Sequence, residues 1–514
     1  MYFPLTLLAF LGPVDLAWAE MPLHAVPEGP RVWVLEVEDG GAEQLAAHLS
    51  RIHPDWHVLA GGPWVEVIGP LDPGALEGLD GVTRVREPWP LSHKRTESEA
   101  LDEILVPVDW AAQGLTGDGV TVGILDLGFA GLDDLLGEEL PAVVEVWEDG
   151  VGAGISHGTA VAEIVHDVAP GATLRVYPFQ SEVSFIAALE AAEQDGVDVI
   201  NASIGFDNVW HADGSSPVSQ AVDQAADAGM LYVAAAGNEI GRYRIGALTD
   251  SDGDGWLELD GDERVSLVKI AGEISASLRW SEPFGEAETD LELVLFNAVG
   301  ECARSEQDSQ DPYVSVACSE GTSMEAGIWL ASGELPETGW LYAPYGVQDS
   351  YSEAGTLTLP ADAAGAFAVG ALRLGEDEAP VYSSQGPTDD GRIKPDIAAP
   401  SGVSTASYGL LNFSGTSAAA PHVTGVAALL AEHMRRARPE ELTAALVDMA
   451  QDVGEPGVDN VSGAGRVQTG ALPERCGCSS RPGGGSMGGA AILGLWLLGR
   501  RRRGRSSGRS RDQG

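Results

Sequence analysis

The sequence predicts an α/β protein with a mostly parallel sheet, interrupted by an inserted β-sandwich and preceded by a small α+β unit. Short apolar runs typical of buried strands lie at 120–125, 174–178, 197–204 and 230–236. Segments with helical spacing separate these runs at 158–168, 184–195 and 217–228. This alternation indicates three layers, with helices on both faces of the sheet, and ligands in such folds bind beyond the carboxyl ends of the strands.

The composition is that of a soluble globular protein with a strongly acidic body. The 514 residues exceed one ordinary domain, and 44% of them are apolar and 21% charged. The net charge is −49, although the tail from Arg475 onward holds nine arginines and one acid. The rest of the chain therefore carries 20 basic and 77 acidic residues. Such a field repels nucleic acid and anionic lipid, which excludes DNA binding.

Residues 1–19 are predicted to be a signal peptide. An apolar run at 5–11 precedes Ala17-Trp18-Ala19, which is a small-x-small cleavage site. Because no Lys or Arg precedes the run, a buried N-terminal helix stays the alternative. A signal peptide predicts export to the cell surface or the medium. In an oxidising compartment Cys302 and Cys318 could pair.

A compact α+β unit is predicted within 20–91. Its strands and helices are expected, in chain order, at 31–38, 43–52, 57–69, 73–79 and 82–87. With two strands in the third of these stretches, the order βαββαβ predicts a ferredoxin-like sheet with helices on one face. Residues 92–114 are a predicted linker. Because exposed links are where chains are usually cut, we expect a cut within 88–106.

The α/β pattern breaks after Asn238. Residues 241–357 show hairpin-like alternation, which is clearest where apolar residues alternate with polar ones from Ile274 to Trp280. This pattern predicts the inserted β-sandwich. The α/β pattern resumes near 366–370, so the two parts of that domain are expected at 115–240 and 358–472.

The C-terminal region has three parts. Residues 473–486 form a Cys/Gly/Ser linker, and 487–514 hold an apolar segment followed by arginines. The apolar segment is shorter than the ~20 residues of a membrane-spanning helix, which favours an interfacial anchor held by the arginines. Together the parts resemble the sorting tails of myxobacterial surface proteins, which implies surface display through Cys476 or Cys478. A disordered basic tail is the alternative.

The stretch 415–425 is the most informative, because it predicts a tight turn that opens into a buried helix with Ser417 in its first turn. The positive end of the helix dipole favours an oxyanion beside that serine. Pro421 is expected to be tolerated because a first turn has no intrahelical donors to lose. A helix start with a chance serine is common, and so the interpretation depends on partner residues.

Two further side chains at element ends supply such partners. A serine nucleophile needs a base, which a histidine supplies near neutral pH, and an acid must orient that imidazole. Asp126 closes the first apolar strand, and His157 opens a helix. Each has an ordinary alternative, since an acid at a strand end often caps a turn and a His before Gly-Thr can cap a helix.

These motifs resemble those of the subtilisin-like serine proteases (subtilases, peptidase S8 family). The chain order Asp, His, Ser is that of subtilisin. Further segments that match the family lie at 198–205, 234–238, 383–387 and 394–400. The resemblance implies a serine endopeptidase that hydrolyses peptide bonds through an acyl-enzyme, with Asp126, His157 and Ser417 as catalytic triad and Asn238 at the oxyanion.

The resemblance also implies substrate-binding and regulatory parts. Ser203, Ile204 and Gly205 would pair with the substrate backbone, and main-chain pairing of this kind permits broad specificity. The unit at 20–91 resembles the family propeptide, a folding template and temporary inhibitor, which implies a zymogen. The implied partners are protein or peptide substrates and the chain's own propeptide, with no nucleic acid and with membrane contact only through the tail.

Three positions depart from the family pattern. Leu127 stands where a small hydroxyl residue is usual, Ala160 where a second His is common, and Glu163 where Gly is usual. None of them is a triad residue, so they bear on local packing and pocket shape rather than on the reaction.

A metal site is predicted only as one of two alternatives. Asp250, Asp252 and Asp254 alternate with Ser251 and Gly253 as in a calcium loop, but Gly261 stands where an EF-hand needs Glu. A structural calcium site and a solvated acidic turn both stay open. No HExxH or paired CxxC motif indicates a catalytic metal, and the predicted chemistry requires no cofactor.

The rival function is a catalytically silent surface adhesion protein, in which the β insert binds and the protease-like fold is a scaffold. Such a protein would not be labelled by a fluorophosphonate. Processing of one dedicated partner is a narrower alternative within proteolysis, and casein digestion would separate it from broad activity.

Overall fold

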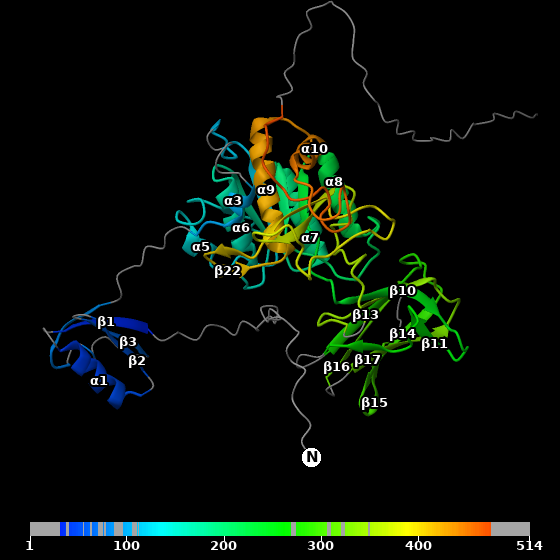
Figure 1. The fold of residues 1–514 in the computed structure, drawn as a ribbon, viewed down its shortest axis with the longest axis horizontal. Coiled ribbons are helices and arrows are strands. Elements are labelled where there is room, and N and C mark those ends of the chain that lie inside the picture. The colour runs from blue at the N-terminus through cyan, green and yellow to red at the C-terminus, as the bar shows by residue number, and fades with distance from the viewer. Residues whose placement is uncertain are drawn as a thin grey trace, which may run out of the picture. The chain divides into compact units, whose positions relative to one another are not determined.

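A computed structural model describes residues 31–37, 41–54, 56–61, 64–69, 76, 79–86, 96–104, 110, 113–268, 274–305, 310–319, 324–347 and 350–473 (Figure 1). The predicted signal peptide and the apolar, Arg-rich tail lie outside these residues, as does most of the helix expected at 73–79. Among the described residues, no helix has the length and apolar character needed to cross a bilayer.

The N-terminal unit is a four-stranded antiparallel sheet with one long helix. The sheet has the order β2-β3-β1-β4. Its elements are β1 (Arg31–Val37), α1 (Ala42–Ile52), β2 (His57–Gly61), β3 (Trp64–Gly69) and β4 (Val82–Arg86). Helix α1 buries Ala42, Ala46 and Leu49, whose spacing of three and four residues places them on one face. They pack with Leu35 and alternate residues of β3 in one small core.

The predicted α/β domain is a seven-stranded sheet in which every neighbouring pair is parallel. The sheet has the order β20-β19-β9-β8-β5-β7-β6. Its strands are β5 (Thr121–Asp126), β6 (Glu145–Val146), β7 (Thr173–Pro178), β8 (Val199–Ala202), β9 (Leu231–Ala235), β19 (Ala366–Arg373) and β20 (Ile397–Ser401). The prediction of a parallel α/β sheet is confirmed.

Helices cover both faces of this sheet. They are α3 (Ala100–Ile104), α5 (Leu132–Leu135), α6 (His157–Val168), α7 (Glu182–Gln194), α8 (Pro217–Ala228), α9 (Thr416–His433) and α10 (Pro439–Met449). In β9, Val233 packs in the core with α6 and α9, whereas Tyr232 packs in the core with α7 and α8. Successive strand residues point to opposite faces, so one strand serves both cores. Helices α6 and α9 lie side by side (Figure 1).

Helix α9 is buried from Thr416 to Leu430, and Pro421 lies inside it. The expectation that Pro421 sits in the first turn is wrong, since it follows Thr416 by five residues. A proline there leaves the carbonyl four residues earlier, that of Ser417, without its helical donor. The Ser203 hydroxyl donates to this carbonyl at 3.0 Å. A neighbouring loop therefore supplies the hydrogen bond that the helix cannot make.

Part of the predicted linker packs into the α/β domain. Ser98 is 2% exposed, and its hydroxyl lies 2.7 Å from Nε2 of the buried His422. The Glu99 carboxylate accepts hydrogen bonds from the backbone and side chain of Ser404. Trp110 is fully buried, and its indole donates to a backbone carbonyl near the end of the domain. Residues 96–104 and 110 thus belong to the domain core.

The insert consists of antiparallel strands along one hydrogen-bonded path, β15-β14-β17-β11-β10-β18-β13-β16, with β12 paired to β17. The strands are β10 (Tyr243–Thr249), β11 (Trp256–Leu259), β12 (Val265–Leu267), β13 (Ile274–Trp280), β14 (Asp290–Asn297), β15 (Gly300–Arg304), β16 (Tyr313–Cys318), β17 (Met324–Ser332) and β18 (Thr338–Tyr342). Strand β16 contacts β14 and β15, so the ends of the path meet around one core. A disulfide between Cys302 and Cys318 joins β15 to β16.

Candidate active site

The carboxyl end of β5 places an acid against a histidine. Asp126 is the last residue of β5 and is fully buried. His157 is the first residue of α6, and its Nδ1 lies 2.8 Å from Asp126 Oδ2. Since the carboxylate accepts from Nδ1–H, a neutral ring keeps its lone pair on Nε2. The predicted contact between these residues is present in the structure.

Two opposing effects act on the pKa of His157. Burial lowers the pKa because it disfavours the charged ring, whereas the Asp126 carboxylate raises it through its charge and its hydrogen bond. The carboxylate prevails, and the pKa of His157 is raised. The ring is 21% exposed, so one side of it still faces solvent.

Ser417 lies in the first turn of α9 and is 6% exposed. Gly415 precedes the helix with φ at +104°, a conformation that favours glycine. The Ser417 hydroxyl donates to the Ser203 carbonyl at 3.2 Å. Within the described residues, no hydrogen bond joins this hydroxyl to His157. The ring of Phe413, four residues before Ser417, packs edge-on against the His157 ring at 5.4 Å between centroids.

Asn238 follows β9 and is oriented by the start of α9. Its Oδ1 accepts a hydrogen bond from the Thr416 backbone N–H at 2.9 Å and lies 3.3 Å from the Thr416 hydroxyl. Because the amide oxygen faces Thr416, the Nδ2 group points away from it. Asn238 and Ser417 both line one small cavity. The Ser417 backbone N–H also lies in the first helical turn, where amide groups have no intrahelical acceptor.

The predicted substrate-binding segment lines the same cavity. Ser203, Ile204 and Gly205 all contribute to its wall, together with Thr358. A Cβ atom on Gly205 would lie 1.6 Å from the Thr358 hydroxyl, so only glycine fits there. The structure thus gathers the predicted segment, Asn238 and Ser417 around one cavity.

The model of the subtilase family matches residues 117–253 and 298–465, which is more than half of the chain. The chain belongs to the subtilase family. The unmatched stretch between the two parts falls within the all-β insert, so this subtilase carries additional strands inside the family domain.

The curated relatives of this subtilase include subtilisin DY of Bacillus licheniformis, which is 34% identical over 142 residues, 25% of this chain and 50% of that protein. Alkaline elastase YaB of Bacillus sp. (strain YaB) is 29% identical over 186 residues, 33% of this chain and 47% of that protein. The chain spans about half the length of these relatives. The solved structure of the Clostridium perfringens CspB protease has the same fold, with a TM-score of 0.55 at 17% sequence identity. The match covers 72% of this chain and 95% of the CspB chain.

The three residues at which this subtilase departs from the family pattern have different surroundings. Glu163 is 1% exposed and accepts hydrogen bonds from the backbone N–H groups of Ala406 and Ser407. Burial raises the pKa of Glu163, against these hydrogen bonds. Ala160 is fully buried, and Leu127 is 39% exposed at the rim beside Asp126. None of these three positions coincides with Asp126, His157 or Ser417.

The role of Thr416 in this subtilase was not predicted from the sequence. Its backbone N–H and hydroxyl both lie against Asn238 Oδ1, and its hydroxyl accepts from the Gly237 N–H at 3.1 Å. Thr416 therefore joins the turn after β9 to the start of α9. The only signal in the sequence was its place directly before the predicted nucleophile.

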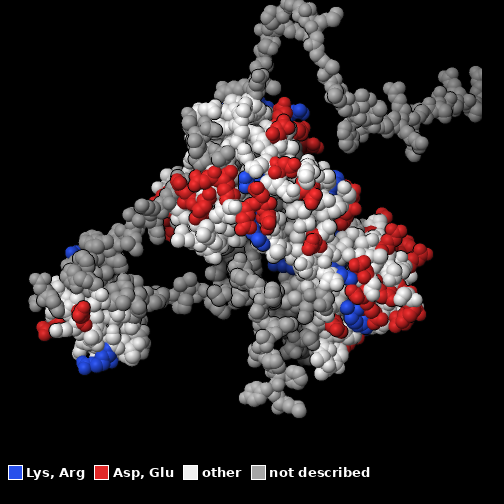
Figure 2. Space-filling model, in the orientation of Figure 1, with Lys and Arg blue, Asp and Glu red and all other residues white. Residues whose placement is uncertain are grey.

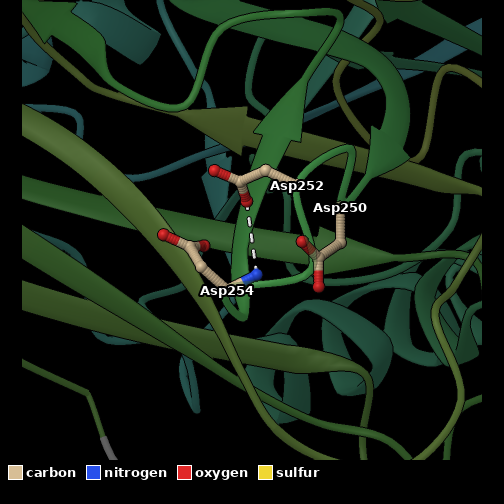
Figure 3. Close-up of side chains that lie close together, drawn as sticks. All are labelled: Asp250, Asp252 and Asp254. Carbon is tan, nitrogen blue, oxygen red and sulfur yellow. Dashed lines mark hydrogen bonds between the residues drawn. The ribbon is translucent and has the colours of Figure 1, made fainter.

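The three aspartates of the predicted calcium loop lie close together in the insert (Figure 3). Each of Asp250, Asp252 and Asp254 offers a carboxylate oxygen within 4.8 Å of the others. The carboxylates also accept hydrogen bonds from backbone N–H groups of the same loop. These oxygens suit Ca²⁺, which prefers carboxylate ligands, and they equally suit a hydrated acidic turn.

Proposed function

We propose that this subtilase is a serine endopeptidase and that Asp126, His157 and Ser417 are its catalytic triad. The observation that carries the proposal is the 2.8 Å contact between His157 Nδ1 and Asp126 Oδ2, at the same sheet edge as Ser417 and Asn238. This contact leaves Nε2 free to act as a base. The proposed substrates are proteins and peptides.

The reaction uses these residues in sequence. The Ser417 hydroxyl turns from the Ser203 carbonyl toward His157 Nε2, gives up its proton there and attacks the peptide carbonyl carbon. Asn238 Nδ2 and the Ser417 N–H donate hydrogen bonds to the resulting oxyanion. The C–N bond then breaks as His157 returns the proton to the leaving amine, which leaves an acyl-enzyme. His157 next takes a proton from water as the water oxygen attacks the ester carbonyl. It then returns this proton to the Ser417 oxygen as the acyl C–O bond breaks, which releases the acid and restores the enzyme.

Fluorophosphonate labelling tests this function directly. The mature protein should form a covalent adduct at Ser417, located by peptide mapping, and should cleave casein. Labelling without casein cleavage would favour the processing of one dedicated partner. A mature protein that is not labelled would support the rival adhesion function and overturn the proposal.

The raised pKa of His157 predicts the acid side of the pH profile. Protonated His157 cannot accept the Ser417 proton, so activity falls as the pH drops through the pKa of His157. Because this pKa is raised, kcat/KM should fall to half of its maximum at a pH above 6.5, which is the ordinary pKa of histidine. The profile of kcat/KM with a soluble peptide measures this midpoint. A midpoint clearly below 6.5 would contradict the assignment.

We also propose that the unit at 31–86 is a propeptide, removed by a cut that precedes Thr96. The sequence allowed a cut anywhere within 88–106. The packing of Ser98, Glu99 and α3 favours the earlier part of that range, because a cut inside 96–104 would separate buried groups from the domain. Mass spectrometry of the mature protein should find an N-terminus between 88 and 96. An N-terminus after Thr96 would refute this prediction.

Export and surface display remain part of the proposal. Other relatives are the extracellular serine protease of Serratia marcescens and the minor extracellular protease Vpr of Bacillus subtilis (strain 168). These extracellular relatives, together with the predicted signal peptide and sorting tail, support an exported protease held at the cell surface. Fractionation of cells with and without residues 487–514 tests the anchor, since the truncated protein should move to the medium.

Calcium at Asp250, Asp252 and Asp254 stays one of two predictions. If the loop binds Ca²⁺, removal by a chelator should lower the melting temperature of the insert, and Asp252→Asn should abolish this shift. If the loop is a solvated turn, chelator and Ca²⁺ should leave the melting curves of both proteins identical. The proposed reaction itself requires no metal.

A further inference from the structure

The cavity beside Ser417 contains two acidic residues. Its volume is about 80 Å³, and Asn238 and Ser417 lie at one side of it. Asp207 and Glu239 line it as well, along with apolar groups that include Ala235. A buried carboxylate is costly unless hydrogen bonds or an opposite charge satisfy it. The partners of Asp207 and Glu239 therefore decide what the cavity can accept.

Glu239 is satisfied within the protein. Nη1 of Arg242 donates to its carboxylate and lies 3.1 Å from Oε2 and 3.4 Å from Oε1. The hydroxyl of Tyr342, on strand β18 of the insert, lies 3.0 Å from Glu239 Oε2. The carboxylate thus has a guanidinium and a hydroxyl against it. No further cation is needed to balance Glu239.

Asp207 is not satisfied in the same way. Its Oδ2 lies 3.2 Å from the Tyr342 hydroxyl, which also faces Glu239. A hydroxyl carries one proton and cannot donate to both carboxylates at once. Asp207 Oδ1 is buried and has no hydrogen-bond partner among the described residues. Among the described residues, Arg242 is the only basic side chain that an ion pair or a hydrogen bond joins to either acid, and its partner is Glu239.

The charges lead to the same result. Two carboxyl groups share one guanidinium, which leaves one negative charge without a partner when both acids are ionised. Burial and the neighbouring Glu239 raise the pKa of Asp207 to about 7, although Arg242 and the Tyr342 hydroxyl act against this. A cation that enters the cavity would favour the ionised form and supply the missing partner.

We propose, resting on the proposed protease function, that this cavity holds the side chain of the residue whose carbonyl Ser417 attacks, and that Asp207 makes the enzyme select Lys or Arg there. The cavity borders both Ser417 and Asn238, so a carbonyl held between them places the adjoining acyl-side Cα at its mouth. A long apolar stem can lie along Ala235 while its charged end donates to Asp207 Oδ1.

The surface charge supports a basic substrate. The chain has a net charge of −49, and the face shown in Figure 2 carries many Asp and Glu side chains and few Lys and Arg. A negative field raises the local concentration of cationic peptides and speeds their association. This field acts on every basic segment, whereas Asp207 would act only on the side chain in the cavity.

A panel of matched peptides tests the selection in the wild-type mature enzyme. The peptides differ only in the acyl-side residue, which is Lys, Arg, Gln, Leu or Phe, and mass spectrometry locates each cut. We expect kcat/KM for Lys and Arg to exceed the value for Leu by about 100-fold, the scale of a desolvated, hydrogen-bonded charge pair. A preference for Leu or Phe would overturn the proposal and would indicate that Asp207 is protonated and the cavity takes neutral side chains.

Asp207→Asn tests the residue itself, because the amide keeps the size of the side chain and removes its charge. The ratio of kcat/KM for Lys to that for Leu should fall about 100-fold, mainly through slower cleavage after Lys. Asp227→Asn, which makes the same change at an exposed residue of α8, should leave the ratio unchanged. An unchanged ratio in Asp207→Asn would refute the role of Asp207.

Fluorophosphonate labelling separates failure of this inference from failure of the protease function. Asp207→Asn should still be labelled at Ser417, because Asp207 does not contact Ser417 in the described hydrogen-bond network. A labelled wild type without preference for Lys or Arg contradicts only the selectivity. A wild type that is neither labelled nor active contradicts both. If Asp207→Asn does not fold, the wild-type panel alone decides.

Discussion

Replacing Ser417 with alanine should lower kcat by about 10⁶-fold, the scale known for loss of the nucleophile in subtilisin. The change removes the only oxygen that can form the acyl bond in the proposed reaction. The fold should persist, because the Ser203 hydroxyl donates to the backbone carbonyl of residue 417, which alanine also has. Only the weaker bond from the hydroxyl to the Ser203 carbonyl is lost. Initial rates of peptide cleavage, together with fluorophosphonate labelling, measure the effect.

Ser414→Ala is the matched control for that variant. Ser414 lies three residues earlier, outside α9, and makes no hydrogen bond among the described residues. We expect its activity and labelling to equal those of the wild type. Labelling that persists in Ser417→Ala and disappears in another serine variant would show that the nucleophile is misassigned.

Replacing Asp126 with asparagine should lower kcat by about 10⁴-fold while the protein stays folded. An amide can donate a hydrogen bond to Nδ1, which would leave the proton on Nε2, where the base must accept it. The variant also loses the charge that raises the pKa of His157, while the burial that lowers this pKa remains. The acid limb of the pH profile should therefore move to lower pH. Measurement of kcat/KM against pH tests both effects together.

The control and the double variant make the Asp126 prediction more specific. Asp133→Asn changes an exposed acid in α5 and should leave the activity and the acid limb unchanged. Because triad residues act as a unit, Asp126→Asn added to Ser417→Ala should cause almost no further loss. Retention of more than about a tenth of the activity in Asp126→Asn would exclude Asp126 as the orienting acid, given the loss expected for such a residue.

The residues of the candidate site were visible in the sequence because each ends or begins an element. Asp126 closes an apolar run, His157 opens a helix and Ser417 follows a turn that requires Gly415. In a parallel sheet the carboxyl ends of all strands lie at one edge, so residues at those ends are expected to meet. The contact between Asp126 and His157, which are 31 positions apart, follows that rule.

The partners of these residues were not predictable in the same way. Tyr342 of the insert lies 135 positions from Asp207 and 103 positions from Glu239 in the chain. Its hydroxyl contacts both carboxyl groups and so joins the insert to the α/β domain. Alternation of apolar residues shows that Tyr342 belongs to a strand, but it does not show which loop that strand reaches. The expectation for Pro421 failed because this residue lies beyond the first turn of α9, and the compensating donor, Ser203, lies on a distant loop that the sequence did not indicate.

The sequence by itself determined the order of the elements, the buried runs of the parallel sheet and the residue types at the ends of those runs. It could do so because periodicity, turn chemistry and helix starts depend on residues close together in the chain. Only the tertiary structure decided how α9 accommodates Pro421 and which carboxylate oxygen of the cavity beside Ser417 has no donor among the described residues. Those features depend on contacts between residues more than a hundred positions apart, and local patterns contain no information about strand order or register.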